Sequence, residues 1–139
     1  MKVIVDIGNS QTKIAISQNK TISKLKTFSS KEINKVKKYL INICNKQVCT
    51  LFYSSVLGND FEKEFRSISQ NIFRKVTRFK STKSFLSVKN AYKIPSKLGS
   101  DRWAQIIGAH KMYKENIMLV SCGSAISIDF VTKKGIHKG

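Results

Sequence analysis

The residues best suited to chemistry lie in the first turn of the sequence. An apolar run at residues 3–5 ends in the carboxylate of Asp6, and Gly8, Ser10 and Lys13 follow shortly after it. Backbone N–H groups at a glycine-containing turn can cradle phosphate oxygens, while a serine hydroxyl donates a hydrogen bond and a lysine neutralises charge. A carboxylate beside them can hold Mg²⁺, which prefers oxygen ligands. The pattern indicates a phosphate and metal site at a hairpin tip, or else an ordinary turn with Asp6 as a solvated acid.

A second group of polar residues lies at positions 99–102, where a loop is expected to become a helix. Gly99 and Ser100 precede Asp101 and Arg102. The first backbone N–H groups of a helix have no partner within the helix, so they can bind an anion. Asp101 would then serve as a general base for a substrate hydroxyl, and Arg102 would hold a substrate oxygen. The alternative is structural: Asp101 caps the helix and interacts favourably with its dipole.

The first turn has a weak echo near the end of the chain. An apolar strand at residues 118–120 leads into Gly123 and Ser124, as residues 3–5 lead into Gly8 and Ser10. Each glycine turn is followed by another apolar segment. Two such hairpins facing each other would clamp the phosphates of a nucleotide from both sides.

The elements that must position these residues are expected to form a mixed α/β fold. Short apolar runs predict strands, and apolar residues at helical spacing predict helices. The stripe from Ile33 to Ile43 predicts a helix that Ser29 or Ser30 would cap. The predicted strands are residues 3–5, 14–16, 20–28, 48–55, 72–79, 117–120 and 126–131, the further predicted helices lie at 61–68 and 99–115, and 80–98 is read as mostly loop.

Length and composition predict a single-domain cytoplasmic protein. The chain has 139 residues, and its 41% hydrophobic content can support a core. No apolar run reaches the ~18 residues of a membrane span, and the sequence enters a strand without a secretory segment. The three cysteines, Cys44, Cys49 and Cys122, lack metal-ligand spacing and are expected to be reduced thiols. His110 and His137 are too far apart to suggest a metal site.

The acidic and basic residues are very unequal in number. The net charge is +18, from 26 basic and eight acidic residues. A basic face for nucleic acid would produce this balance, and so would a lysine-biased sequence with solvated surfaces. Arginine, the usual reader of guanine edges, occurs only four times, and the lysines are scattered. We therefore favour solvated surfaces and expect no specific nucleic-acid partner.

Three of the eight acids have unusual surroundings. Asp6, Asp101 and Asp129 lie beside glycine turns or in apolar strands, whereas the others lie in polar stretches that look helical. An acid in an apolar or turn setting usually has a partner or a function.

The sequence resembles the type III pantothenate kinases, which have the fold of the actin, sugar kinase and Hsp70 ATPase superfamily. The resemblance covers essentially the whole chain and implies an α/β, ribonuclease H-like or actin-like ATPase domain, with a mixed sheet and flanking helices. It divides the chain into a first domain at residues 1–115 and the start of a second, truncated domain at 116–139. Three ordered blocks carry it: Asp6-Ile7-Gly8-Asn9-Ser10-Gln11-Thr12-Lys13, then Tyr92 with Gly99-Ser100-Asp101-Arg102, then Gly123-Ser124-Ala125 followed by Ile128-Asp129.

The resemblance implies ATP-dependent phosphorylation of pantothenate, the first step towards coenzyme A. Asp101 would accept the proton of the attacking hydroxyl, and Asp6 would lie near Mg²⁺. Phosphoryl transfer depends chiefly on positioning and charge neutralisation, which agrees with these roles. The implied ATP-binding residues are Asp6, Ile7, Gly8, Asn9, Ser10, Gln11, Thr12, Lys13, Gly123 and Ser124, and the implied pantothenate-binding residues are Tyr92, Gly99, Ser100, Asp101 and Arg102.

The chain departs from the family in two ways. Ser121 stands where the family usually carries an acid that helps to bind a monovalent cation, which argues against bound K⁺; Ser124 replaces a threonine but keeps the hydroxyl. Family members are homodimers and continue well beyond position 139. Besides a pantothenate kinase, two alternatives therefore stay open. One is a non-catalytic truncated relic or regulatory binding protein of the same fold, and the other is a basic nucleic-acid-binding domain.

Overall fold

Strands with one buried face organise the first part of the chain. In this computed structural model, which describes residues 1–19, 21–23, 25–44, 48–123 and 125–139, contacts group the chain into two units, Met1–Phe79 and Lys80–Gly139. We describe each unit by itself. The elements of the first unit are β1 (Lys2–Ile7), β2 (Gln11–Gln18), β3 (Thr21–Ile22), β4 (Lys26–Ser29), α1 (Ile33–Cys44), β5 (Thr50–Ser55), α2 (Asn59–Gln70) and β6 (Lys75–Arg78).

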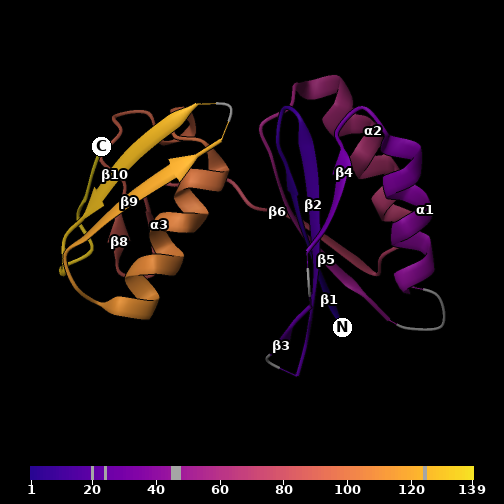
Figure 1. The fold of residues 1–139 in the computed structure, drawn as a ribbon, viewed down its shortest axis with the longest axis horizontal. Coiled ribbons are helices and arrows are strands. Elements are labelled where there is room, and N and C mark those ends of the chain that lie inside the picture. Colours follow the sequence, from indigo (N-terminus) through magenta and orange to yellow (C-terminus); the bar gives the residue numbers. More distant parts are fainter. Residues whose placement is uncertain (20, 24, 45–47, 124) are drawn as a thin grey trace. The chain divides into compact units, whose positions relative to one another are not determined.

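The first unit is a mixed sheet with two helices on one face (Figure 1). Its strand order is β3-β2-β1-β5-β6, and β4 also pairs with β2. β1 and β2 form an antiparallel hairpin, whereas β5 runs parallel to β1 and β6 runs parallel to β5. The parallel pairs need crossovers, and α1 and α2 supply them. The pairing places the start of β2 next to the ends of β1 and β5, where these strands finish on the same side of the sheet.

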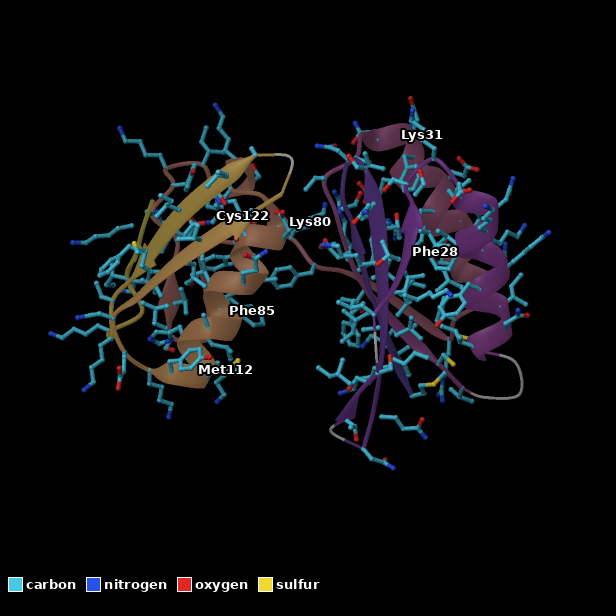
Figure 2. The ribbon with its side chains drawn as sticks, in the orientation of Figure 1. Phe28, Lys31, Lys80, Phe85, Met112 and Cys122 are labelled. Carbon is cyan, nitrogen blue, oxygen red and sulfur yellow. The ribbon has the colours of Figure 1, made fainter. Side chains whose placement is uncertain are left out.

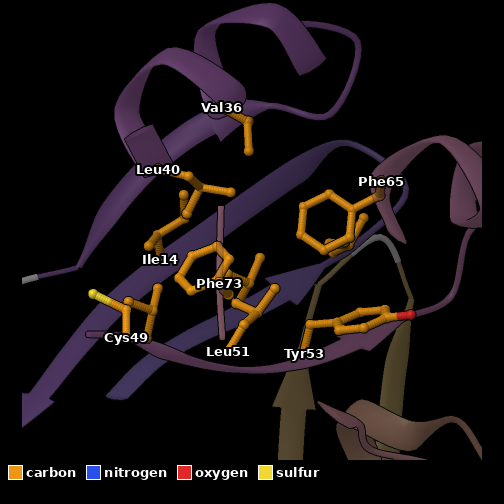
Figure 3. Packing of buried hydrophobic residues seen from close by; sticks show 11 residues of the cluster. Ile14, Val36, Leu40, Cys49, Leu51, Tyr53, Phe65 and Phe73 are labelled. Atoms are coloured by element: carbon orange, nitrogen blue, oxygen red, sulfur yellow. The ribbon is translucent and has the colours of Figure 1, made fainter. Parts of the chain in front are cut away.

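The core of the first unit lies between the sheet and these two helices (Figure 3). Alternate residues of each strand point into it because successive side chains in a strand face opposite sides. Val36 and Leu40 of α1 and Phe65 of α2 reach the same cluster. The fully buried strand residues include Val3, Val5, Ile7, Ile14, Leu51 and Tyr53.

The second unit is a helix packed on an antiparallel sheet. The sheet has the order β11-β10-β9, and α3 contacts β9 and β10. Trp103, Ile106 and Ile107 of the helix are buried, so apolar packing holds these elements together. The elements are β7 (Ser84–Phe85), β8 (Val88–Lys89), a 3₁₀ turn (Pro95–Lys97), α3 (Ser100–Tyr113), β9 (Ile117–Cys122), β10 (Ile126–Val131) and β11 (His137–Lys138).

The predicted α/β class with a mixed sheet is confirmed, and two segments differ from the prediction. Residues 20–28 do not form one strand, because β3 and β4 pair with β2 separately. Residues 80–98 contain the short β7–β8 hairpin and a 3₁₀ turn within the expected loop. The predicted domain boundary at residue 115 falls just after α3, inside the second unit, and stays a prediction about the family's domains.

Among the residues that the structure describes, no helix combines the length and apolar character needed to cross a bilayer. Cys44, Cys49 and Cys122 are reduced thiols, as expected. Nitrogen-tipped side chains project from both units (Figure 2). This distribution agrees with the interpretation of the lysines as solvated surface.

Candidate active site

The first candidate loop is the tip of the β1–β2 hairpin. The Gly8 amide donates to the Gln11 carbonyl oxygen at 3.0 Å, which closes the turn between the strands. A Cβ on Gly8 would lie only 3.2 Å from that oxygen, so a side chain here would crowd the turn. Asn9 and Ser10 are exposed at the tip. The sequence therefore folds into a tight turn that presents backbone and small polar groups to solvent.

Ser30 anchors this tip from the end of β4. Its hydroxyl donates to the Gly8 carbonyl at 2.7 Å and lies 3.2 Å from the Thr12 hydroxyl, and its amide donates to the Ser10 carbonyl at 3.0 Å. Thr12 and Ser30 are both buried. Ser29 or Ser30 was expected to cap the following helix, but the Ser30 hydroxyl fixes the hairpin tip and the Ser29 hydroxyl accepts from the Lys31 amide at 3.4 Å, before the helix begins. Local sequence could not reveal a contact between residues 22 positions apart.

Asp6 lies at the end of β1 on the sheet face opposite the core. Its Oδ1 accepts a hydrogen bond of 2.7 Å from Ser54, its register partner on β5. Lys13 is its register partner on β2, so the two side chains share that face. The structure thus places the half-buried Asp6 carboxylate and Lys13 on one face, and their role in a phosphate and metal site stays a prediction. Sequence analysis missed Ser54, because only the parallel pairing of β1 and β5 brings it close.

The chemistry of these groups fits a magnesium ion that is shared with a nucleotide. Mg²⁺ is usually held by one or two carboxylates together with substrate phosphates and waters. Asp6 supplies one such carboxylate, and no cluster of three or more His, Cys, Asp or Glu side chains occurs among the described residues. Asp6 would therefore be the ligand that this hairpin offers to the ion.

An open cleft of about 390 Å³ lies beside the hairpin tip. Asn9, Ser30 and Lys31 line one side, and the residues at the start of α2 line the other. Figure 2 labels Lys31 at the rim of the first unit. The predicted phosphate-binding turn thus borders a space that a ligand can enter.

In the second unit, the residues at positions 99–102 form the start of α3. Gly99 is the N-cap residue, and no side-chain cap hydrogen bond is present. Asp101 lies in the first turn, where its charge is favourable to the helix dipole, but it does not cap the helix. A Cβ on Gly99 would come within 2.5 Å of Asp101 Oδ1. The carboxylate therefore folds back over Gly99 and occupies space that only glycine leaves open.

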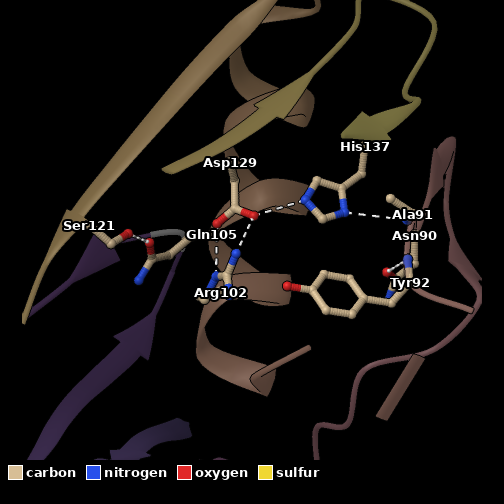
Figure 4. Close-up of polar contacts among 8 residues, drawn as sticks. All are labelled: Asn90, Ala91, Tyr92, Arg102, Gln105, Ser121, Asp129 and His137. Carbon is tan, nitrogen blue, oxygen red and sulfur yellow. Dashed lines mark hydrogen bonds and ion pairs between the residues drawn. The ribbon is translucent and has the colours of Figure 1, made fainter. Parts of the chain in front are cut away.

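Arg102 and Tyr92 meet around two residues that are absent from the predicted site (Figure 4). Arg102 Nε and Nη2 donate to Asp129 Oδ2 and Oδ1 at 2.9 and 2.7 Å. His137 Nε2 lies 2.8 Å from Asp129 Oδ1. The Tyr92 ring stacks on His137, with centroids 6.2 Å apart and planes 12° apart. The structure thus brings two of the predicted pantothenate-binding residues together through Asp129 and His137.

The electrostatic interactions within this cluster favour the charged forms of Asp129 and Arg102. Burial raises the pKa of Asp129, but hydrogen bonds from Arg102 and His137 outweigh it and hold that pKa below its ordinary value. The pKa of Arg102 is raised, chiefly by its hydrogen bond to Asp129, and Tyr92 adds a smaller contribution. The carboxylate and guanidinium are therefore both ionised across the physiological range. The acid in an apolar strand does have partners, as its setting indicated.

The second glycine turn joins β9 to β10. The Gly123 amide donates to the Ala125 carbonyl at 3.1 Å, which confirms the predicted turn. Ser124, the predicted nucleotide-binding hydroxyl, lies outside the described residues. Ser121 donates its hydroxyl to Gln105 Oε1 on α3. The weakened monovalent-cation site expected from a neutral Ser121 stays a prediction.

The predicted residues thus fall into separate groups. Residues 6–13 form one continuous hairpin in the first unit, and Tyr92, Asp101 and Arg102 lie around the start of α3 in the second. The expected convergence of the two glycine turns around one nucleotide stays a prediction.

Comparison with known proteins gives one consistent match. A family model described as type III pantothenate kinase matches residues 2–139. The type III pantothenate kinase of Thermosipho melanesiensis is 30% identical over 142 residues, which cover 100% of this chain and 57% of that protein. That of Azobacteroides pseudotrichonymphae is 29% identical over 140 residues, 100% of this chain and 55% of its own.

A shorter and more similar match comes from Hahella chejuensis. Its type III pantothenate kinase is 36% identical over 94 residues, which cover 68% of this chain and 39% of that protein. The chain therefore spans about half the length of the curated relatives that it matches. Because the family model covers nearly every residue, the chain belongs to the type III pantothenate kinase family.

Proposed function

We propose that this chain takes part in the ATP-dependent phosphorylation of pantothenate to 4′-phosphopantothenate, on an actin-like ATPase fold. The family match over residues 2–139 is the observation that carries the proposal. The chemistry of the two units supports it. One presents an acid, a lysine and a glycine turn. The other presents an acid and an arginine at the start of α3, with a tyrosine beside the arginine.

Each group has a role in this proposal. The hairpin tip at residues 8–10 binds phosphate oxygens through its backbone, and Lys13 neutralises their charge. Asp101 accepts the proton of the attacking pantothenate hydroxyl, because a carboxylate that orients the nucleophile is a recurring part of phosphoryl transfer. Arg102 and Tyr92 bind the pantothenate carboxylate. Mg²⁺, when bound beside Asp6, neutralises charge on the phosphates.

A monovalent cation has no role in this proposal. Ser121 carries no charge, and its hydroxyl is donated to Gln105. We therefore expect binding of MgATP to be the same in potassium chloride and in choline chloride at equal ionic strength.

The proposal is tested by incubating the purified chain with pantothenate and MgATP and measuring 4′-phosphopantothenate by mass spectrometry. Asp101→Asn should lower turnover by ~10²–10⁴-fold, which is the typical contribution of a general base. Glu115→Gln, which removes an exposed acid from the same unit, is the matched control and should keep normal turnover. Normal turnover in Asp101→Asn would remove Asp101 from the chemistry. Absence of product together with no pantothenate binding would overturn the function.

A second candidate is a non-catalytic binding protein of the same family. Ser121 carries no charge at a position where the resemblance implies an acid, and that observation favours it. Calorimetric titration of the chain with pantothenate and MgATP separates the two candidates. Binding without product formation supports the second candidate, whereas measurable turnover dismisses it.

The resemblance also extends to assembly and location. We propose a cytoplasmic homodimer, with residues 1–115 as the first domain and residues 116–139 as the start of the second. Sedimentation velocity over a range of concentrations tests the assembly. A single species at the monomer mass at all concentrations would contradict it.

A further inference from the structure

Asp129 connects three separate segments of the second unit. It lies on β10 and accepts hydrogen bonds from Arg102 on α3 and from His137 on β11. His137 in turn lies 3.4 Å from the Ala91 amide, next to Tyr92. Asp129 and His137 are both almost completely buried. A buried carboxylate is costly unless it is paired and hydrogen-bonded, so these contacts make the cluster a fixed unit of structure.

The hydrogen-bond pattern settles which nitrogen of His137 carries the proton. The Ala91 N–H can only donate, so Nδ1 accepts from it. Nε2, which faces the Asp129 carboxylate, must then carry a proton and donate it. With this tautomer the imidazole is satisfied at both nitrogens. The ring lies nearly parallel to the Tyr92 ring, with centroids 6.2 Å apart, and so restricts where the tyrosine can lie.

Asp129 also fixes the direction of Arg102 without using all of its donors. A guanidinium has five N–H donors in a rigid fork. The bonds to Asp129 use the Nε donor and one Nη2 donor, so three are not committed to this carboxylate. The Arg102 side chain keeps 25% of its surface exposed, whereas Asp129 keeps 3%. One edge of the fork is therefore locked inside the unit, and the rest faces outwards near the Tyr92 hydroxyl.

We propose that Asp129, supported by His137, is a positioning residue that aims the Arg102 guanidinium and the Tyr92 hydroxyl at the carboxylate of the substrate. This inference rests on the function proposed above. It adds two residues that contact no substrate to the five predicted pantothenate-binding residues. It also predicts a specific defect: loss of Asp129 weakens recognition of the substrate's negative charge rather than binding in general.

Pantothenol isolates that defect, because an alcohol replaces the carboxylate of pantothenate and the rest of the molecule is the same. We would measure dissociation constants for both compounds by calorimetry in the presence of Mg²⁺ and a non-hydrolysable ATP analogue. In the wild-type chain, pantothenate should bind ~10-fold or more tightly than pantothenol, as expected for a charge-assisted hydrogen bond. In Asp129→Asn that preference should largely disappear, while the affinity for pantothenol stays the same. Glu115→Gln, which removes one exposed acid, should keep the preference.

The outcomes are distinguishable. Equal loss of affinity for both compounds, or no loss for either, would overturn the positioning role and leave the proposed function standing. Failure of the wild-type chain to bind pantothenate would overturn both. If Asp129→Asn does not fold, as judged by circular dichroism, His137→Gln replaces it, because it keeps the Arg102–Asp129 pair. The preference for pantothenate should then fall by ~3-fold or more, since one hydrogen bond and the ring that supports Tyr92 are lost; an unchanged preference would overturn the proposal.

Discussion

Ser54 and Asp6 are register partners on neighbouring parallel strands, and the serine hydroxyl donates a 2.7 Å hydrogen bond to the aspartate. The bond fixes the carboxylate that we assign to the metal. Ser54→Ala should weaken the apparent affinity for MgATP by roughly tenfold, the lower end of the effect of removing such supporting groups. The free energy of unfolding should fall by about 1 kcal/mol.

Both quantities for Ser54→Ala can be measured, the first by calorimetric titration and the second by urea denaturation. Ser67→Ala is the matched control, because Ser67 is an exposed serine on α2. It should change neither quantity appreciably. Unchanged MgATP binding in Ser54→Ala would remove the assigned role of this hydrogen bond.

Two glycines at the start and in the interior of α3 should respond in opposite ways to alanine. Gly99→Ala would bring a Cβ within 2.5 Å of Asp101 Oδ1 and displace the carboxylate. Turnover should fall by about 10²-fold, as expected for a misplaced catalytic group. Gly108→Ala meets nothing within 4 Å. It should keep turnover and stabilise the chain by roughly 0.5–1 kcal/mol, because alanine is the better helix former. Equal turnover in the two variants would contradict the assignment of Asp101.

The stability of the chain should depend on pH through Asp129. Its pKa is lower in the folded chain than in the unfolded chain, so its stabilising contribution is present above the unfolded pKa and is lost as pH falls through the folded pKa. Asp129→Asn should lower the free energy of unfolding by on the order of 2 kcal/mol at neutral pH. The difference from wild type should shrink below about pH 4. Urea denaturation between pH 2 and 8 checks this, and a difference that stays constant would refute it.

The three thiols should differ in reactivity. Burial raises the pKa of Cys44 to about 12, with a further contribution from Cys49, and Cys49 is itself buried. Cys122 is exposed and lies on β9, where Figure 2 labels it. Because the thiolate is the reactive form, iodoacetamide at pH 8 should modify Cys122 first and leave the other two largely intact. Peptide mapping by mass spectrometry measures the order, which should disappear in denaturant.

The high net charge should give only non-specific binding to nucleic acid. Fluorescence anisotropy with two unrelated oligonucleotides should detect binding at low salt. Affinity should fall by about 10³-fold or more between 50 and 200 mM salt, as expected for binding by phosphate contacts alone. A sequence preference that survives physiological salt would instead support the nucleic-acid-binding alternative.

Long apolar patterns predicted their elements well. Strand β10 matches the predicted residues 126–131, and α3 lies within the predicted helix at 99–115. The prediction of one strand at 20–28 failed for a physical reason. Ile22, Leu25 and Phe28 are spaced by three, and a strand cannot place such residues on one face. Ile22 and Leu25 are accordingly exposed.

The sequence alone indicated which residues of the site could do chemistry, but it did not reveal the residues that hold them in place. Asp6 and Arg102 stood out locally, by their residue types beside glycines. Their partners Ser54 and Asp129 lie 48 and 27 positions away, and only strand pairing and helix packing bring them close. His137 looked like an isolated histidine until the hairpin of β10 and β11 placed it against Asp129. The spacing of residues in the sequence does not predict contacts between residues so far apart in the chain.

The mixed sheet of the first unit has a consequence for the order in which the chain folds. The β1–β2 hairpin joins Asp6 to Lys13 across a short turn, whereas Ser54 reaches Asp6 only after the crossover through α1 closes. Local hairpins form within microseconds, and pairings distant in sequence form more slowly. During folding, the β1–β2 hairpin that carries Asp6 and Lys13 is therefore expected to form before Ser54 can hold the Asp6 carboxylate in place. The oriented acid that a metal ion requires would then appear only at a late stage of assembly.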